Sequence, residues 1–350
     1  MARAYPTRQL GPDGPTVSAI GFGVGSFGDF YGKANQADAP LLLSYAADHG
    51  VTFWDTSNYY GASERLIGEW FASTGRRSEI FLASKFGAAP RPDGPHKGKP
   101  SSEPESIVRA IEDSLKTLQT DYIDLYYQHR VDPTIPIEIV LETLRPYVER
   151  GTIRWVGLSE CSPATLRRAK AVPIVGPKLI AVQMEYSPFE TSIETSGLRA
   201  TATELGVAVV AYSPLGRGLV TGRYRSPDDF AENDLRRLMP RYSKENFPAN
   251  LVLVEEFKKL ADKYNAKPGQ IALAWLLAQD PYVVPIPGTM ALSRLEENSN
   301  AAFLTLKPED LTHIRQLVDN ADIQGARSGN MANLVGECIE LADWEKQKGN

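Results

Sequence analysis

The feature that most constrains this 350-residue chain is a regular alternation between two kinds of apolar segment. Short runs rich in β-branched residues are predicted as strands: Val17–Gly23, Val51–Asp55, Ile80–Lys85, Tyr122–His129, Ile153–Ser159, Leu179–Met184, Val207–Ser213 and Val283–Pro287. They alternate with segments that carry apolar residues at helical spacing: Ala39–Gly50, Ser63–Ser73, Pro104–Leu118, Pro136–Arg150, Pro163–Val172, Ile193–Leu205, Pro268–Gln279 and Leu292–Ala302. Several of these helices begin with proline in the first turn. Eight such units predict a (β/α)₈ TIM barrel, an α/β fold.

The competing architecture is a doubly wound sheet, which would need fewer strands and a reversal of strand order. We expect one barrel domain over residues 1–350, because α/β barrels of this size commonly form a single domain. Turn signals in residues 1–16 predict a hairpin that caps the barrel floor. Two further segments are predicted as extra helices, Asn250–Tyr264 and Pro308–Asn320. Two long loops, Gly87–Glu103 and Leu215–Pro248, follow strands. This places them on the rim of the barrel, where long loops usually shape substrate pockets. The tail, 321–350, has little clear periodicity and is expected near the substrate loops.

Composition narrows the function classes. The net charge of −5 and the sequence pI of about 5.6 disfavour a nucleic-acid partner. The two cysteines, Cys161 and Cys338, are too few for a disulfide framework, and no Cys/His spacing suggests a metal. The N-terminus lacks an apolar signal region, and no long uncharged apolar stretch could span a bilayer. We expect a cytoplasmic protein without membrane, nucleic-acid or metal partners, as a monomer or small homo-oligomer.

Proton-handling side chains follow three consecutive predicted strands. Asp55 ends one strand, and Tyr60 comes five residues later, just before a glycine. Lys85 ends the next strand, and His129 ends the one after it. In a parallel barrel the carboxyl ends of the strands share one rim, so these four groups are predicted to face one pocket.

Carbonyl reduction needs a hydride donor and an acid that protonates the developing alkoxide. A tyrosine has an ordinary pKa of about 10, and a nearby ammonium lowers that value. Lys85 is placed to do this for Tyr60, Asp55 can pair with Lys85, and His129 can hydrogen-bond the substrate oxygen. The four residues together therefore predict general acid catalysis, with preorganised donors at the reacting oxygen.

Each of these residues has a simpler structural explanation when taken alone. Asp55 and Lys85 could form a structural ion pair, Tyr60 could be a packing residue in a turn, and His129 could be a core histidine. Their joint occurrence at successive strand ends favours the site. Asp55 with Glu185 could be imagined as a glycosidase pair, but nothing else in the sequence supports sugar hydrolysis and Lys85 would have no role.

A Gly-x-Gly-x-x-Gly pattern spans residues 23–28. It is disfavoured as a dinucleotide-binding fingerprint, because residues 29–40 read as a loop and no acidic strand end follows about twenty residues on. A glycine-rich first loop, whose backbone at Gly25 lies close to cofactor and substrate, explains the pattern better.

Over nearly its whole length the sequence resembles the aldo-keto reductase superfamily, whose Asp–Tyr–Lys–His tetrad corresponds to Asp55, Tyr60, Lys85 and His129. The resemblance implies that Ser159, Glu160 and Gln183 hold the nicotinamide carboxamide and that Tyr212 stacks on its ring. The same resemblance implies that the cofactor phosphates and adenine lie on Ser213, Pro214, Leu215, Gly216, Gly218, Pro287, Gly288, Thr289, Arg294, Glu297 and Asn298. Two positions depart from the family pattern: Glu160 replaces the usual asparagine, and Met290 stands where many relatives carry a basic residue.

Within the superfamily, the motifs around residues 157–163, 186–189 and 216–219 look most like the branch that holds perakine reductase and pyridoxal reductase. That resemblance implies NADPH-dependent reduction of a small carbonyl substrate, with NADPH/NADP+ as cofactor and Trp54 and Phe189 as candidate pocket walls. Two alternatives stay open. One is an NAD(P)-dependent sugar or pyridoxal dehydrogenase, and the other is a non-catalytic, cofactor-sensing protein like the potassium-channel β-subunits.

Overall fold

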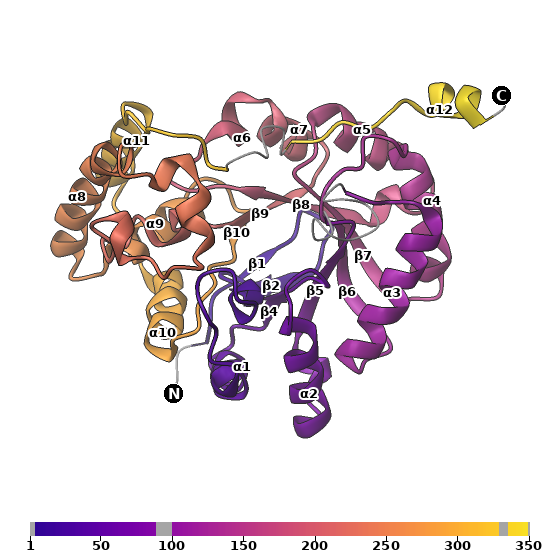
Figure 1. Cartoon of the computed structure of the whole chain (residues 1–350), viewed down its shortest axis with the longest axis horizontal. Coiled ribbons are helices and arrows are strands. Elements are labelled where there is room, and N and C mark those ends of the chain that lie inside the picture. The colour runs from indigo at the N-terminus through magenta and orange to yellow at the C-terminus, as the bar shows by residue number, and fades with distance from the viewer. Residues whose placement is uncertain (1–3, 89–99, 329–334, 349–350) are drawn as a thin grey trace.

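The computed structural model describes residues 4–88, 100–328 and 335–348. Eight parallel strands form one sheet in the order β10-β9-β8-β7-β6-β5-β4-β3 (Figure 1). The strands are β3 (Phe22–Gly23), β4 (Phe53–Asp55), β5 (Phe81–Phe86), β6 (Ile123–Gln128), β7 (Ile153–Ser159), β8 (Leu179–Glu185), β9 (Ala208–Tyr212) and β10 (Val283–Pro285). Parts of the predicted rim loop (residues 89–99) and of the predicted tail (residues 329–334 and 349–350) lie outside the described residues.

Backbone hydrogen bonds between the first and last strands close the sheet into a barrel. The amide of Gly21 donates to the carbonyl of Pro285 at 2.9 Å, and that of Gly23 donates to Pro287 at 3.1 Å. A Cβ atom at Gly23 would lie 2.6 Å from the Ile286 carbonyl oxygen, so only glycine permits this approach. The predicted barrel is confirmed, and the doubly wound sheet is wrong because closure leaves no reversal point.

Helices wrap the outside of the barrel (Figure 1). The helices that follow successive barrel strands are α1 (Ala39–Asp48), α2 (Ser63–Thr74), α3 (Pro104–Leu118), α4 (Ile137–Glu149), α5 (Pro163–Ala171), α7 (Leu198–Glu204), α9 (Pro268–Leu277) and α10 (Leu292–Asn300). The additional helices are α6 (Ser192–Thr195), α8 (Phe247–Tyr264), α11 (Pro308–Asp319) and α12 (Leu341–Lys348). Short 3₁₀ turns cover Val24–Phe27, Gln36–Asp38, Arg77–Glu79, Gly176–Lys178, Gly216–Gly218, Pro227–Asp229, Leu235–Leu238, Pro240–Tyr242 and Ala301–Phe303. The two predicted extra helices are confirmed as α8 and α11, whereas α12 was not predicted.

Helix α3 shows how the sequence pattern places a helix on the barrel. Pro104 occupies its first turn, where a missing amide hydrogen costs nothing. Ile107, Ile111 and Leu118 recur at helical spacing and are fully buried. Burial of this apolar stripe against the barrel stabilises the docked helix, by about 25 cal/mol for each Å² of apolar surface removed from water.

The N-terminal hairpin pairs β1 (Thr7–Gln9) with β2 (Thr16–Ser18) in antiparallel fashion. Leu10 and Val17 of this hairpin pack in the same buried cluster as the barrel-interior residues Phe53 and Leu125. The predicted cap is therefore confirmed, but its boundary was wrong, because the run 17–23 splits between the hairpin and barrel strand β3.

A second correction concerns the helix predicted over 193–205. It is broken into α6 and α7 at Gly197, whose φ of +80° lies in the left-handed region that a continuous helix excludes. Apolar spacing runs through both halves, which is why periodicity alone did not reveal the break.

Candidate active site

A fully buried ion pair lies inside the mouth of the barrel. Lys85 on β5 donates from Nζ to Asp55 Oδ1 and, at 2.7 Å, to the Thr56 carbonyl. The second carboxylate oxygen of Asp55 accepts from Gln183 Nε2 at 2.7 Å. Burial raises the pKa of Asp55, and its contacts with Lys85 and Gln183 oppose that rise. Because buried charges need partners, these bonds fix the position of the Lys85 ammonium.

The Tyr60 hydroxyl faces the imidazole of His129. The two are joined at 3.4 Å, from the Tyr60 hydroxyl oxygen to His129 Nε2, and Nδ1 lies 3.1 Å from Ser57 Oγ. The Tyr59 amide already donates to Ser57 Oγ at 3.1 Å, so the serine hydrogen is free to go to Nδ1. With the Ser57 hydrogen assigned to Nδ1, the imidazole hydrogen lies on Nε2 and points toward the Tyr60 hydroxyl. Burial lowers the pKa of His129 well below its ordinary value, helped by the charges of Arg130 and Lys85, so the ring is neutral.

The structure also brings Tyr60 and Lys85 together. Lys85 Nζ lies 5.0 Å from the centre of the Tyr60 ring. Burial nevertheless raises the pKa of Tyr60 by more than the Lys85 ammonium lowers it. Lys85 therefore lowers the pKa of this phenol as expected, but in the protein alone desolvation of the phenolate outweighs that one neighbouring cation.

The first loop supports the Tyr60 ring. A Cβ atom at Gly25 would lie 3.3 Å from that ring, so glycine lets the backbone pass beside it. The four tetrad residues come from the end of β4, the loop before α2, β5 and the residue after β6. They meet as predicted because carboxyl ends of parallel barrel strands share one rim.

The residues predicted to hold a nicotinamide lie at the next three strand ends. Ser159 ends β7 and is buried, Gln183 lies in β8, and Tyr212 ends β9. The Gln183 amide nitrogen is already engaged with Asp55. Its carbonyl oxygen remains as the group that a carboxamide could use.

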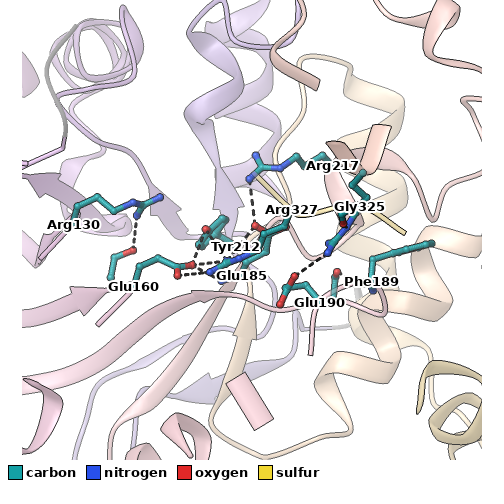
Figure 2. A network of polar contacts seen from close by, with 12 residues as sticks. Arg130, Glu160, Glu185, Phe189, Glu190, Tyr212, Arg217, Gly325 and Arg327 are labelled. Atoms are coloured by element: carbon teal, nitrogen blue, oxygen red, sulfur yellow. Dashed lines mark hydrogen bonds and ion pairs between the residues drawn. The ribbon is translucent and has the colours of Figure 1, made fainter. Parts of the chain in front are cut away.

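Glu160 was predicted to hold the nicotinamide carboxamide, but its side chain binds other groups of the protein. It is completely buried, and its carboxylate accepts from both terminal nitrogens of Arg327, at 2.7 and 2.9 Å (Figure 2). It also accepts from the Tyr212 hydroxyl at 2.7 Å and the Glu185 amide at 3.2 Å. Burial raises the pKa of Glu160, but the hydrogen bond and charge of Arg327, together with the charge of Arg130 and the Tyr212 hydroxyl, lower it overall. A carboxylate committed to so many donors cannot also hold a cofactor amide.

The backbone of Glu160 continues this attachment. Its carbonyl accepts from the Gly336 amide at 2.8 Å, and the Ser162 amide donates to the Gly336 carbonyl at 3.1 Å. A Cβ atom at Gly336 would lie 2.7 Å from Val131, so glycine suits this contact. Glu160 is therefore an anchor for the C-terminal segment. Arg327 is 167 residues away in the chain, and no local motif pointed to it.

The loop after β9 has an unusual backbone. Ser213, Gly216, Arg217 and Gly218 all have positive φ, between +48° and +91°. Pro214 and Leu215 lie within the same turn, and the Tyr242 hydroxyl donates to the Gly216 carbonyl at 2.8 Å. Successive left-handed residues can direct several amides toward one point, a geometry that suits anions such as phosphate.

The family model described as "Aldo/keto reductase family" matches residues 19–319 of the chain, which include all of the site residues described above except those of the C-terminal segment. The chain belongs to the aldo/keto reductase family. It is 48% identical over 328 residues to "Aldo-keto reductase yakc [NADP(+)]" of Schizosaccharomyces pombe, covering 93% of this chain and 94% of that protein. It is 45% identical over 345 residues to "Aldo-keto reductase str7" of Strobilurus tenacellus, covering 96% and 98%. A crystal structure of the thermostable aldo-keto reductase Tm1743 in complex with the inhibitor epalrestat has a TM-score of 0.69 and 28% identity, covering 89% of this chain and 99% of that one.

In this aldo/keto reductase the segment after β10 gathers positive charge. Gly288 bridges to Gly23, and Thr289 Oγ1 accepts from Arg294 Nε at 3.0 Å. Burial lowers the pKa of Arg294, and the charge of Arg223 lowers it further. Arg223 lies in the long loop after β9, near enough for its charge to act on Arg294. Pro287, Glu297 and Asn298 belong to the same segment and the helix after it, α10.

Of the two predicted pocket walls, Trp54 is contradicted by the structure and Phe189 stays a prediction. Trp54 is fully buried, its ring centre is 4.9 Å from that of Trp70, and its Nε1 donates to Val51 at 2.8 Å. The prediction that it lines the pocket is wrong, because strand side chains alternate and Asp55 takes the barrel side. Phe189 is buried beside the loop after β9, where a Cβ atom at Gly216 would lie 3.1 Å from its ring.

In residues 4–88, 100–328 and 335–348, no cluster of three or more His, Cys, Asp or Glu side chains could hold a metal ion. Within the same ranges no helix is long and apolar enough to cross a membrane. The narrower resemblance to the perakine and pyridoxal reductase branch stays a prediction.

Proposed function

We propose that this protein reduces an aldehyde or ketone to the alcohol with NADPH, reversibly, and that Tyr60 is the proton donor. The observation that carries the proposal is the Tyr60 hydroxyl, placed between neutral His129 and the buried Lys85–Asp55 pair. A protonated phenol is the form that reduction requires, and burial keeps Tyr60 in it.

Each residue of the tetrad has a separate task in this scheme. The substrate oxygen would accept a hydrogen bond from His129 Nε2 and one from the Tyr60 hydroxyl. As negative charge grows on that oxygen, Tyr60 releases its proton, and the Lys85 ammonium stabilises the resulting phenolate. Asp55 holds Lys85 in position through a direct hydrogen bond. A neutral His129 orients the substrate without competing as an acid.

The residues present fit a nicotinamide dinucleotide. When bound, NADPH supplies the hydride. Ser159 and Gln183 would hold its carboxamide, Tyr212 would stack on its ring, and the left-handed loop at 213–218 would receive its pyrophosphate. Thr289, Arg294, Arg223, Glu297 and Asn298 would hold its adenosine end. The curated S. pombe relative carries NADP(+) in its name.

The two arginines at the adenosine end give a direct test of cofactor choice. Arg223 and Arg294 repel each other, and a 2′-phosphate would relieve that repulsion. Arg294→Ala and Arg223→Ala should each weaken NADPH binding by about 10- to 100-fold and NADH binding by less than about threefold. Fluorescence titration measures both constants. Arg225→Ala is the matched control, since Arg225 pairs with Glu255 at the surface. Equal losses for the two cofactors would place the phosphate elsewhere.

The proposed reaction is tested by following NADPH oxidation with a panel of aldehydes and ketones. We expect turnover with several of them, and faster with NADPH than with NADH. Binding of NADPH without oxidation by any carbonyl would favour the cofactor-sensing alternative. A preference for NAD+ and an alcohol substrate would favour the dehydrogenase.

We also propose that residues 1–350 work as one barrel domain whose tail, 321–350, lies beside the substrate. The attachment of Arg327 to Glu160 supports this placement. A monomer or small homo-oligomer in the cytoplasm stays our expectation.

A further inference from the structure

Several guanidinium groups around the barrel mouth are paired with a carboxylate. Arg217 lies 3.3 Å from Glu185, and Arg327 lies 2.7 Å from Glu160. Arg241 pairs with Glu190 at 3.1 Å. These side chains are largely removed from water, where an unpaired charge is costly. Paired guanidinium groups are therefore the expected arrangement at this rim.

Arg130 has no carboxylate partner among the described residues, and it lies on the β6 side of the rim, away from Arg223 and Arg294, which also lack one. It directly follows His129, and its Nη1 donates to the His129 carbonyl at 2.7 Å and to Ser159 Oγ at 3.3 Å, both neutral acceptors. No carboxylate of the described residues lies within ion-pair distance of it. Figure 2 shows its guanidinium apart from the Glu160–Arg327 pair. Its remaining N–H donors are available for a planar anion.

The balance of charge at the mouth points the same way. Arg217 and Arg327 pair with Glu185 and Glu160, and Lys85 pairs with Asp55, while Arg130 has no such partner. One positive charge is left over, although the whole chain carries a net charge of −5. A bound anion would complete the pairing, and its own charge would be attracted into the mouth.

The position of Arg130 in the barrel separates this anion from the cofactor phosphates. Arg130 follows β6, whereas the candidate phosphate-binding residues follow β9 and β10. In the closed eight-stranded barrel, β6 lies opposite β10. Arg130 is instead next to the catalytic rim: after the larger effect of burial, its charge adds to the lowering of the His129 pKa and opposes the rise of the Tyr60 pKa.

We propose that Arg130 binds an anionic group on the substrate itself, so that the preferred substrates are aldehydes or ketones carrying a carboxylate or phosphate. This inference rests on the proposed function, because it concerns the same pocket. The carbonyl oxygen lies at Tyr60 and His129, and the anionic end of the molecule lies on the guanidinium of Arg130. Arg130 is thus the residue that determines specificity for charge.

The test compares two aldehydes of nearly equal shape, 4-carboxybenzaldehyde and the neutral 4-carbamoylbenzaldehyde, with NADPH as donor. The wild-type protein should show at least about tenfold higher kcat/KM for the carboxylate, since charge-assisted hydrogen bonds of this kind contribute about 1.5–3 kcal/mol. Arg130→Gln should reduce the ratio of the two kcat/KM values about 10- to 100-fold, mainly through KM. Arg130→Lys should retain part of the preference, because it keeps the charge but loses the planar fork.

Arg150→Gln is the matched control. Arg150 follows α4 at the opposite end of the barrel and contacts Thr152, so this variant removes the same charge far from the mouth. An unchanged ratio in Arg130→Gln, or a wild-type protein indifferent to the carboxylate, would overturn the inference while leaving carbonyl reduction intact. So would a loss of NADPH affinity as large as the loss of preference, because Arg130 would then serve the cofactor. If no carbonyl compound is reduced, the proposed function fails and this inference fails with it. The wild-type comparison keeps the test valid should Arg130→Gln not fold.

Discussion

Lys85→Met is expected to lose about 3–5 kcal/mol of unfolding free energy together with nearly all carbonyl reduction. Methionine nearly matches lysine in volume, so the packing space stays filled. The loss arises because Asp55 would remain buried without its cation, held only by Gln183. Urea unfolding of the wild type and the variant measures the change in free energy.

The double variant Lys85→Met/Asp55→Asn separates stability from catalysis. Neutralising Asp55 removes the unpaired buried charge, and we expect most of the unfolding free energy to return. Activity should stay as low as in the single variant, because no ammonium remains near Tyr60. Full stability of the single Lys85→Met variant would mean that the pair is hydrated in solution, contrary to the structure.

Tyr60→Phe is expected to reduce kcat for carbonyl reduction about 10²- to 10⁴-fold, the usual contribution of a positioned general acid. The hydroxyl makes one long contact, with His129, so its removal should change the unfolding free energy by less than about 1 kcal/mol. NADPH affinity, measured by quenching of tryptophan fluorescence, should change by less than about threefold. Such a result would assign the loss to the proton-transfer step.

Tyr59→Phe is the control for this substitution. Tyr59 precedes Tyr60, is exposed, and stacks on Phe30 at 5.8 Å between ring centres. The same chemical change there should leave kcat within about twofold of wild type, since phenylalanine keeps the Tyr59 ring, 6.2 Å between centres from that of His129, and keeps the backbone amide that donates to Ser57. A wild-type rate in Tyr60→Phe itself would refute the acid assignment.

The sequence predicted what depends on strand order and periodicity. Asp55, Lys85 and His129 could be placed on one rim because each ends or follows a strand, and parallel strands align those ends. The prediction for Trp54, one residue before Asp55, was wrong because successive side chains of a strand point to opposite faces of the sheet. With Asp55 facing the barrel interior, Trp54 faces the surrounding helices. The division of residues 17–23 between the hairpin and the first barrel strand was not predicted, because a hairpin strand and a barrel strand have the same kind of composition.

Other features depend on contacts between distant parts of the chain. Glu160 could be recognised as a departure from the family pattern, but its partner Arg327 lies 167 residues later. The charge of Arg223 acts on Arg294, which lies 71 positions later in the chain. The pKa of Tyr60 depends on a balance between burial and the charge of Lys85, and burial cannot be read from strand ends.

The central claim is that the phenol of Tyr60, and not the imidazole of His129, gives the proton. The most direct test is the rate of NADPH oxidation in a single turnover, measured as a function of pH. Burial raises the pKa of Tyr60 and lowers that of His129, so between about pH 6 and about pH 9 the phenol stays protonated and the imidazole stays neutral. The account predicts a level rate across this range, and Tyr60→Phe should lie far below it at every pH. A wild-type rate that falls tenfold per pH unit above about pH 6.5 would show that an imidazolium is the acid, and would contradict the account.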